Sequence, residues 1–257
     1  MNITYNSVTI PFFDFEVPSH LVMSLSGGID SASLMYLTCK HFPQIEIIPV
    51  TLSDVNGGVD AAAAANITTW MQTEFPAVTI RDLQTFDFND QDESIVTNAQ
   101  CDQMMADHPD QYANRSSASK SIQIDNILQG VSSSYLRMNG MTLNPPADEM
   151  VAIHQNFYDM SERCRDAGET PKGTEFIHTV GGNKLYQAYS NIDKKFVADI
   201  YVQNNLMETL FPLTRSCVGA TEDTVNFTLE CHNCFWCFEK KWAFNLPHQD
   251  PTVPTTV

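Results

Sequence analysis

An eight-residue segment near the start of the chain stands between a short apolar run and a stretch with helical character. It reads Ser24-Leu25-Ser26-Gly27-Gly28-Ile29-Asp30-Ser31. Glycines let backbone N–H groups converge on an anion because they carry no Cβ atoms. The first turn of a helix adds unpaired N–H donors and the positive end of the helix dipole. The segment therefore predicts a phosphate-binding turn between a strand and a helix.

The side chains of this segment indicate how it could contact a phosphate. Ser26 and Ser31 add hydroxyl donors to the backbone amides. Asp30 would repel a phosphate directly, so we expect it to cap the helix, to orient the loop, or to act through a cation such as Mg²⁺. The segment is not a Walker A loop, because it has neither the G-x-x-x-x-G-K-[ST] spacing nor a lysine in the turn.

The pattern around this turn predicts alternating strands and helices. We expect strands at residues 22–24, 45–52 and 78–80, and helices at residues 30–41 and 60–75. Such alternation is typical of a parallel sheet with helices on both faces, whose ligands bind at the carboxyl ends of the strands. The sequence therefore predicts a Rossmann-like α/β domain over residues 1–210, with the turn at that edge of the sheet.

The rest of the chain carries weaker patterns. Residues 82–118 are polar and predict a segment that is partly a loop or lid. Helices are expected at 121–137 and 147–164, and one or two helices at 193–210. Residues 141–146 predict a short strand that ends at two prolines. Residues 167–183 predict a mobile connection, and residues 247–257 predict a flexible tail.

The charge balance argues against a broad surface for nucleic acid or anionic lipid. The 257 residues include 14 Lys and Arg against 31 Asp and Glu, which gives a net charge of −17. Such a charge opposes non-specific binding to polyanions, so nucleic acid is not an expected partner. A local basic pocket is compatible with this balance. The cations available for one are Arg115, Lys120, Arg137, Lys184, Lys194, Lys195 and Arg215.

The sequence contains no recognisable targeting or membrane segment. No apolar stretch approaches the ~20 residues of a membrane span. The first residues lack the basic and hydrophobic parts of a signal peptide. We therefore expect a cytoplasmic protein, in which cysteines favour free thiols or metal ligation over disulfides.

Four of the seven cysteines gather late in the chain with the spacing C-x13-C-x2-C-x2-C. They are Cys217, Cys231, Cys234 and Cys237. Two adjacent C-x2-C turns suit tetrahedral ligation, and four thiolates fit a closed structural zinc site. Replacement of one ligand by His232, an iron–sulfur cluster, and unrelated buried cysteines stay open as alternatives. The isolated cysteines, Cys39, Cys101 and Cys164, are expected to be buried thiols.

The two motifs together resemble a known family. The octet resembles the pyrophosphate loop, Ser-Gly-Gly-x-Asp-Ser, of the N-type ATP pyrophosphatases (the PP-loop superfamily), which cleave ATP between the α and β phosphates. Combined with the late cysteine group, it is most similar to the 7-cyano-7-deazaguanine synthase family. Three other segments add to this resemblance: residues 193–195 with their two lysines, residues 211–217 before the first cysteine, and residues 234–244 with a basic-aromatic helix.

This resemblance implies a fold and an activity. The fold is of the adenine nucleotide alpha hydrolase type, with a zinc-bearing region at residues 211–246 of the same unit. The activity is that of an ATP-dependent C–N ligase of queuosine biosynthesis, which uses Mg²⁺ and zinc. It adenylates a small carboxylate, 7-carboxy-7-deazaguanine, and combines it with ammonia to form an amide or nitrile. The resemblance also implies a homodimer.

Site residues follow from the matching positions. The expected catalytic residues are Asp30, Ser31 and Lys194. ATP is expected to bind Ser24, Leu25, Ser26, Gly27, Gly28, Ile29, Asp30, Ser31, Ser53 and Arg215. Zinc is expected to bind Cys217, Cys231, Cys234 and Cys237. Solvated surface positions for Lys194 and Arg215, and a simple turn at Ser53, stay open as alternatives.

The middle of the chain departs from the family pattern. The family's Val-Pro-Gly-Arg-Asn-like segment corresponds to residues 141–146, which hold no arginine, and its Tyr-Pro-Asp-Cys-Arg stretch has only a poor counterpart at residues 158–165. Those segments shape the base pocket in the family, so the acceptor stays open. The alternatives are an adenylating enzyme of tRNA thiolation or amination, which for thiolation would need Cys101 or Cys164 as a reactive thiol, adenylylsulfate-type chemistry, and a non-catalytic nucleotide-binding zinc protein.

Overall fold

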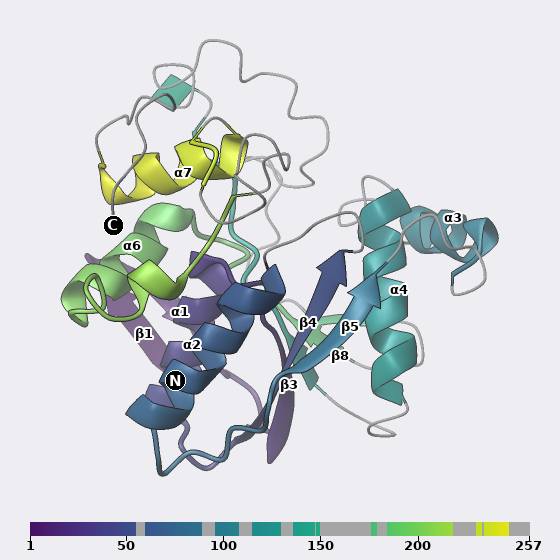
Figure 1. Ribbon diagram of the computed structural model, residues 1–257, viewed down its shortest axis with the longest axis horizontal. Helices are drawn as coiled ribbons and strands as arrows, with labels where there is room; N and C mark the ends of the chain where they lie inside the picture. Colours follow the sequence, from purple (N-terminus) through teal and green to yellow (C-terminus); the bar gives the residue numbers. More distant parts are fainter. Residues whose placement is uncertain are drawn as a thin grey trace.

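A six-stranded sheet forms the centre of the protein (Figure 1). The computed structural model describes residues 1–54, 60–88, 96–107, 115–129, 136–146, 148–149, 176–178, 184–217, 230–232 and 234–246. The strand order is β5-β4-β3-β6-β8-β7. The bounds are β3 His20–Ser24, β4 Glu46–Asp54, β5 Gln84–Phe88, β6 Leu136–Met138, β7 Phe176–His178 and β8 Lys184–Tyr186. Five of the strands are parallel, and the edge strand β7 pairs antiparallel with β8.

Helices cover both faces of this sheet. Three of them, α1 (Ile29–His41), α2 (Asp60–Glu74) and α6 (Lys194–Gln203), share one large apolar core with the inward side chains of β3, β6 and β8. The other face carries a smaller cluster, in which Ile124 of α4 (Arg115–Gln129) packs on Val22, Ile48 and Val50. Within the described part of the chain, no helix combines the length and the apolar character needed to cross a membrane.

Smaller elements extend this core. An N-terminal hairpin, β1 (Asn2–Tyr5) and β2 (Val8–Pro11), packs beside α6, and α3 (Asn98–Asp107) forms a separate small cluster with α4. The chain then passes through a 3-10 turn, η2 (Phe211–Leu213), to α7 (Phe235–Phe244). Helix α7 lies against α6, so the cysteine-bearing region is in contact with the α/β layer (Figure 1).

The structure confirms the prediction of an α/β fold with a parallel sheet and helices on both faces. Strands β3 and β4 and helices α1 and α2 begin and end within about two residues of the predicted bounds. The predicted helix at residues 193–210 is α6, which ends at Gln203, and its N-cap Asp193 accepts a hydrogen bond of 2.8 Å from the Lys195 N–H. These elements were predictable because local apolar patterns and caps specify them.

The predicted strand at residues 78–80 is wrong. Ile80 forms only an isolated parallel bridge with Ile47, and the third strand of this half of the sheet is β5, four residues further on. Residues 82–118, expected to be partly a loop or lid, contain β5, α3 and the first turn of α4 where they are described. Tertiary pairing with β4 decides the strand position here, and the polar side chains of β5 concealed it.

The centre of the chain differs from the sequence prediction in two further places. The helix expected at residues 121–137 ends at Gln129, and Arg137 lies on β6. Residues 141–146, expected as a strand, have no regular structure, because the strand of this region precedes Gly140. The connection expected at residues 167–183 contains β7. The expected helix at 147–164, apart from residues 148 and 149, and the tail at 247–257 lie outside the described residues.

The order of the strands marks where a ligand would bind. Strand β3 is flanked by β4 on one side and by β6 on the other, and in parallel sheets a ligand binds where the connections diverge in this way. Immediately after β6, Gly140 lies against the turn that follows β3. A Cβ atom placed on Gly140 would come within 2.7 Å of the Asp30 carbonyl carbon and 2.8 Å of the Ser31 nitrogen. Only glycine allows these two backbones to approach so closely.

We predict that Gly140→Ala destabilises the protein, whereas Gly28→Ala is tolerated. The first change forces backbone to move and should cost about 1–3 kcal/mol of unfolding free energy. A Cβ on Gly28 would have only ordinary contacts, the nearest at 3.5 Å, and the loss should stay below about 1 kcal/mol. Chemical denaturation of both variants measures the difference. Equal stability of the two would contradict the close approach.

Candidate functional site

The turn after β3 is held by serine hydroxyl groups and by one left-handed glycine. Gly27 has a φ of 80°, a conformation that favours glycine over other residues. The Ser31 hydroxyl accepts a hydrogen bond of 3.2 Å from the Ser26 N–H and donates one of 3.2 Å to the Gly28 carbonyl. The Ser26 hydroxyl lies 3.2 Å from that of Ser31. These contacts close the chain into a tight loop that leads directly into α1.

The N-terminus of α1 lies at the centre of this loop. Gly28 is the N-cap residue and makes no side-chain cap hydrogen bond. A Cβ atom on Gly28 would lie 3.5 Å from the hydroxyls of both Ser26 and Ser216, so this glycine leaves an open cradle between two hydroxyl groups. A helix N-terminus with glycine as its N-cap residue, bordered by hydroxyls, has the donors and the dipole that an anion such as a phosphate requires.

Two buried tyrosines support the first turn of α1. The Tyr201 hydroxyl on α6 donates a hydrogen bond of 3.1 Å to the Ile29 carbonyl, and the Tyr189 hydroxyl lies 3.1 Å from that of Ser33. Burial raises the pKa of both tyrosines well above the usual range, and the negative charge of Asp30 raises it further. Both tyrosines therefore stay neutral and keep a hydroxyl proton for these bonds.

Asp30 forms an ion pair with a buried lysine. Its carboxylate lies 3.2 Å from Nζ of Lys194, the first residue of α6. Lys194 is only 1% exposed and also pairs with Glu239 of α7, which is fully buried. Asp30 lies in the first turn of α1, two residues after the N-cap Gly28. The lysine supplies the cation beside Asp30 and joins the loop to α7.

The chain segment before the first cysteine also contacts the loop. The backbone N–H of Arg215 donates a hydrogen bond of 2.7 Å to the Gly27 carbonyl. The backbone N–H of Ile29 donates one of 3.5 Å to the Ser216 hydroxyl. The next residue is Cys217. Residues 215 and 216 therefore contact the loop at residues 27 and 29, although they are far from it in the sequence.

The structure brings most of the predicted site residues together, with one exception. Residues 24–31, Lys194 and Arg215 lie in one network of contacts, although Lys194 is enclosed and not at the surface. Ser53 lies on β4 in register with Asp87 of β5, three residues beyond Val50, the partner of Ser24. It therefore shares the carboxyl edge of the sheet with the loop, but lies one strand away from it.

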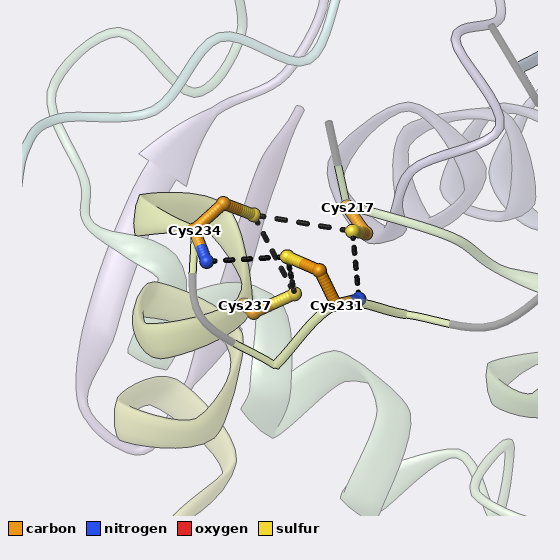
Figure 2. A group of neighbouring side chains, drawn as sticks. All are labelled: Cys217, Cys231, Cys234 and Cys237. Atoms are coloured by element: carbon orange, nitrogen blue, oxygen red, sulfur yellow. Dashed lines mark hydrogen bonds between the residues drawn. The ribbon is translucent and has the colours of Figure 1, made fainter. Parts of the chain in front are cut away.

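The four late cysteines converge (Figure 2). Their Sγ atoms all lie within 4.8 Å of one another. Individual separations are 3.5 Å between Cys234 and Cys237 and 4.0 Å between Cys231 and Cys237 and between Cys234 and Cys217. A tetrahedral ion with Zn–S bonds of about 2.3 Å separates its sulfurs by about 3.8 Å. The cluster therefore fits a single metal ion such as zinc, whereas a multi-iron cluster would need a wider opening between the thiolates.

Backbone N–H groups donate hydrogen bonds to two of these sulfurs. The Cys231 N–H donates to Sγ of Cys217 at 3.1 Å, and the Cys234 N–H donates to Sγ of Cys231 at 3.3 Å. Hydrogen bonds with Cys217 and Cys234, and then burial, raise the pKa of Cys237, so this thiol keeps its proton unless a cation compensates the charge. His232 is not among the atoms that form the cluster, and its φ of 56° shapes the turn between Cys231 and Cys234.

Sequence reasoning missed three residues that shape this region. Gly140, Ser216 and Glu239 contact the loop or its lysine, yet none was among the expected site residues. Ser216 and Glu239 do lie in segments that carry the family resemblance, and Glu239 gave a further signal as an acid within the otherwise aromatic and basic run of α7. A buried acid in such a run requires a cationic partner, but the sequence does not say which one.

Comparisons with known proteins give no identification. No family model and no curated protein matches the sequence of this chain. Its function is therefore inferred from the residues of the site.

We predict that Cys234→Ser removes the metal and the stability together, because ligation free energy is also folding free energy. Metal analysis should find about one zinc ion per wild-type chain and far less in the variant, with a loss of more than about 3 kcal/mol in unfolding free energy. Cys101→Ala is the matched control, because Cys101 lies in the α3–α4 cluster. A Cys234→Ser protein with full metal and unchanged stability would sink the assignment.

Proposed function

We propose that the protein is an ATP-dependent C–N ligase that adenylates a small carboxylate, of the 7-carboxy-7-deazaguanine kind, and combines it with ammonia. The observation that carries the proposal is the serine-glycine loop on the N-terminus of α1, with Lys194 paired to its Asp30 and with Arg215 attached to it. Its position beside the point where the strand order diverges favours a nucleotide as the ligand. The nearby four-cysteine centre is the second half of the family resemblance.

The proposed reaction reaches the amide in two steps, and a second adenylation would convert the amide to the nitrile. A carboxylate oxygen attacks the α-phosphorus of ATP, and pyrophosphate leaves to give an acyl-adenylate. Ammonia then attacks the acyl carbon, and AMP leaves with the carboxylate oxygen on its phosphate, to give an amide. A second adenylation, now at the amide oxygen, followed by loss of AMP, would give the nitrile.

The chain's own residues would contribute positioning and charge neutralisation. The loop amides, the N-terminal dipole of α1 and the hydroxyls of Ser26 and Ser31 would hold the departing pyrophosphate. Arg215 would add a positive charge at the same loop. Lys194 would act from behind the loop, because it is buried, and would fix the orientation of Asp30. Mg²⁺, when bound, would screen the phosphate charges during the attack.

The structure weighs against one alternative, tRNA thiolation. Such an enzyme would need a reactive cysteine outside the metal centre. Cys101 is fully buried in the α3–α4 cluster, and Cys39 is buried in α1 with a pKa raised to about 12 by desolvation. Neither thiol has the solvent exposure that a reactive cysteine requires. The remaining candidate, Cys164, lies outside the described residues.

The test is product analysis by mass spectrometry. Protein, ATP, Mg²⁺ and ammonium would be incubated with 7-carboxy-7-deazaguanine labelled with ¹⁸O in its carboxylate. We expect AMP that carries one ¹⁸O, together with pyrophosphate and the amide or nitrile. AMP without a deazaguanine product would retain the ATP site and redirect the search to another acceptor. No AMP from folded, metal-loaded protein, with this and other carboxylates, would reject the ligase.

We further predict that Gly28→Ala and Asp30→Asn each lower the rate of AMP formation. The added methyl group would fill the cradle between Ser26 and Ser216, and the amide would no longer pair with Lys194. Losing a preorganised group of this kind costs about 10²-fold. Initial rates, with circular dichroism as a folding control, measure the effect. Unchanged rates in both variants would remove the loop from the mechanism.

A further inference from the structure

We propose that the metal-bound cysteine region positions the phosphate loop, and that Ser216 and Glu239 are the residues that couple the two sites. Each of these residues lies close in sequence to a cysteine of the centre and touches either the loop or the lysine behind it. This inference deepens the proposed function, because it takes the loop as the nucleotide site.

The first connection runs through the backbone before Cys217. The backbone N–H of Arg215 donates a hydrogen bond to the Gly27 carbonyl, and the Ser216 hydroxyl accepts one from the Ile29 N–H. Two consecutive residues therefore contact the loop on both sides of Gly28. Cys217 follows without any intervening residue and contributes its sulfur to the cluster. If Cys217 moves when the metal is lost, the two residues that touch the loop must move with it, because they directly precede Cys217 in the chain.

The second connection runs through α7. This helix begins at its N-cap Cys234 and carries Cys237 in its first turn, so the metal fixes the end of the helix. Glu239, two residues later, is fully buried and pairs with Lys194. Lys194 then reaches Asp30 at 3.2 Å. The position of α7 therefore determines whether Lys194 keeps its ion pair with Glu239 beside the one with Asp30.

Burial makes this second connection sensitive. A charged group with 1% exposure cannot replace a lost partner by water, so Lys194 must follow Glu239 or rearrange with Asp30. Glu149, which lies outside both helices, offers a contrast. Its exposed carboxylate pairs with Lys195 of α6 and accepts a hydrogen bond of 2.8 Å from the Trp242 indole of α7.

Hydrogen exchange of the loop tests the coupling without any nucleotide. We expect peptides that cover residues 24–31 to exchange between about 5-fold and about 150-fold faster after zinc is removed with a chelator. The helix Asn98–Asp107 is the internal control, because its buried residues Cys101 and Met104 pack in the α3–α4 cluster. If metal removal unfolds the whole chain, hydrogen exchange becomes faster in every segment, α3 included. The coupling is then tested with metal-loaded variants.

Those variants are Glu239→Gln and Ser216→Ala, with Glu149→Gln as the matched control. The first two should keep one metal ion per chain and still show faster exchange at residues 24–31, and the control should not. Unchanged loop exchange in both metal-loaded variants would overturn the coupling. Because no ATP is present, this result does not depend on whether the ligase proposal is correct.

Reciprocity provides an independent measurement. If the metal tightens ATP binding by some factor, ATP must tighten metal binding by the same factor. Zinc transfer to a colorimetric chelator should therefore be weakened about 5-fold or more by ATP with Mg²⁺ in the wild type, and much less in Glu239→Gln. ATP binding that leaves zinc affinity unchanged would reject the coupling, whereas absence of ATP binding would reject the proposed function alone.

Discussion

The buried lysine between two carboxylates is the interaction on which the site depends. Transfer of a charged amine out of water is unfavourable by several kcal/mol unless partners of opposite charge surround it. Lys194 finds those partners in Asp30, on the first turn of α1, and in Glu239, on α7. Three helices that are distant in sequence must therefore meet at one point. Their apolar contacts, such as Tyr201 on Phe244, allow this meeting, and the charges fix its geometry.

This arrangement is consistent with the acidity of the chain. With a net charge of −17, the protein as a whole repels phosphate. Lys194 contributes little net positive charge to its surroundings, because two carboxylates neutralise it. An anion at the loop would therefore be held mainly by backbone dipoles and serine hydroxyls, which act over a few ångströms and do not need a basic surface.

The sequence was informative where short-range patterns specify the structure. The strand-turn-helix at the loop and the cysteine spacing both depend on residues close in sequence, and both predictions of structure hold. Glu239 and Gly140 could not be assigned, because their partners are remote in the chain: Lys194 lies 45 residues from Glu239, and Asp30 lies 110 residues from Gly140. Arg137 was placed in a helix because apolar residues before it recur at helical spacing. Its actual position on β6 depends on pairing with β3 and β8 and on an ion pair with buried Asp125.

The metal centre has a structural reason to lie beside the loop. The described apolar residues around α7 form a cluster of three buried aromatic side chains, Phe235, Phe238 and Trp242. A second set of contacts, between Tyr201 of α6 and Phe244 of α7, joins the end of this helix to the main core. A metal bound by Cys234 and Cys237 would add a large free energy of ligation at the beginning of the same helix. The position of Glu239, and through it the pairing of Lys194, would then depend on the metal as well as on packing. An enzyme built this way would lose its nucleotide site when its thiolates are oxidised or its metal is withdrawn, although the α/β layer itself stays folded.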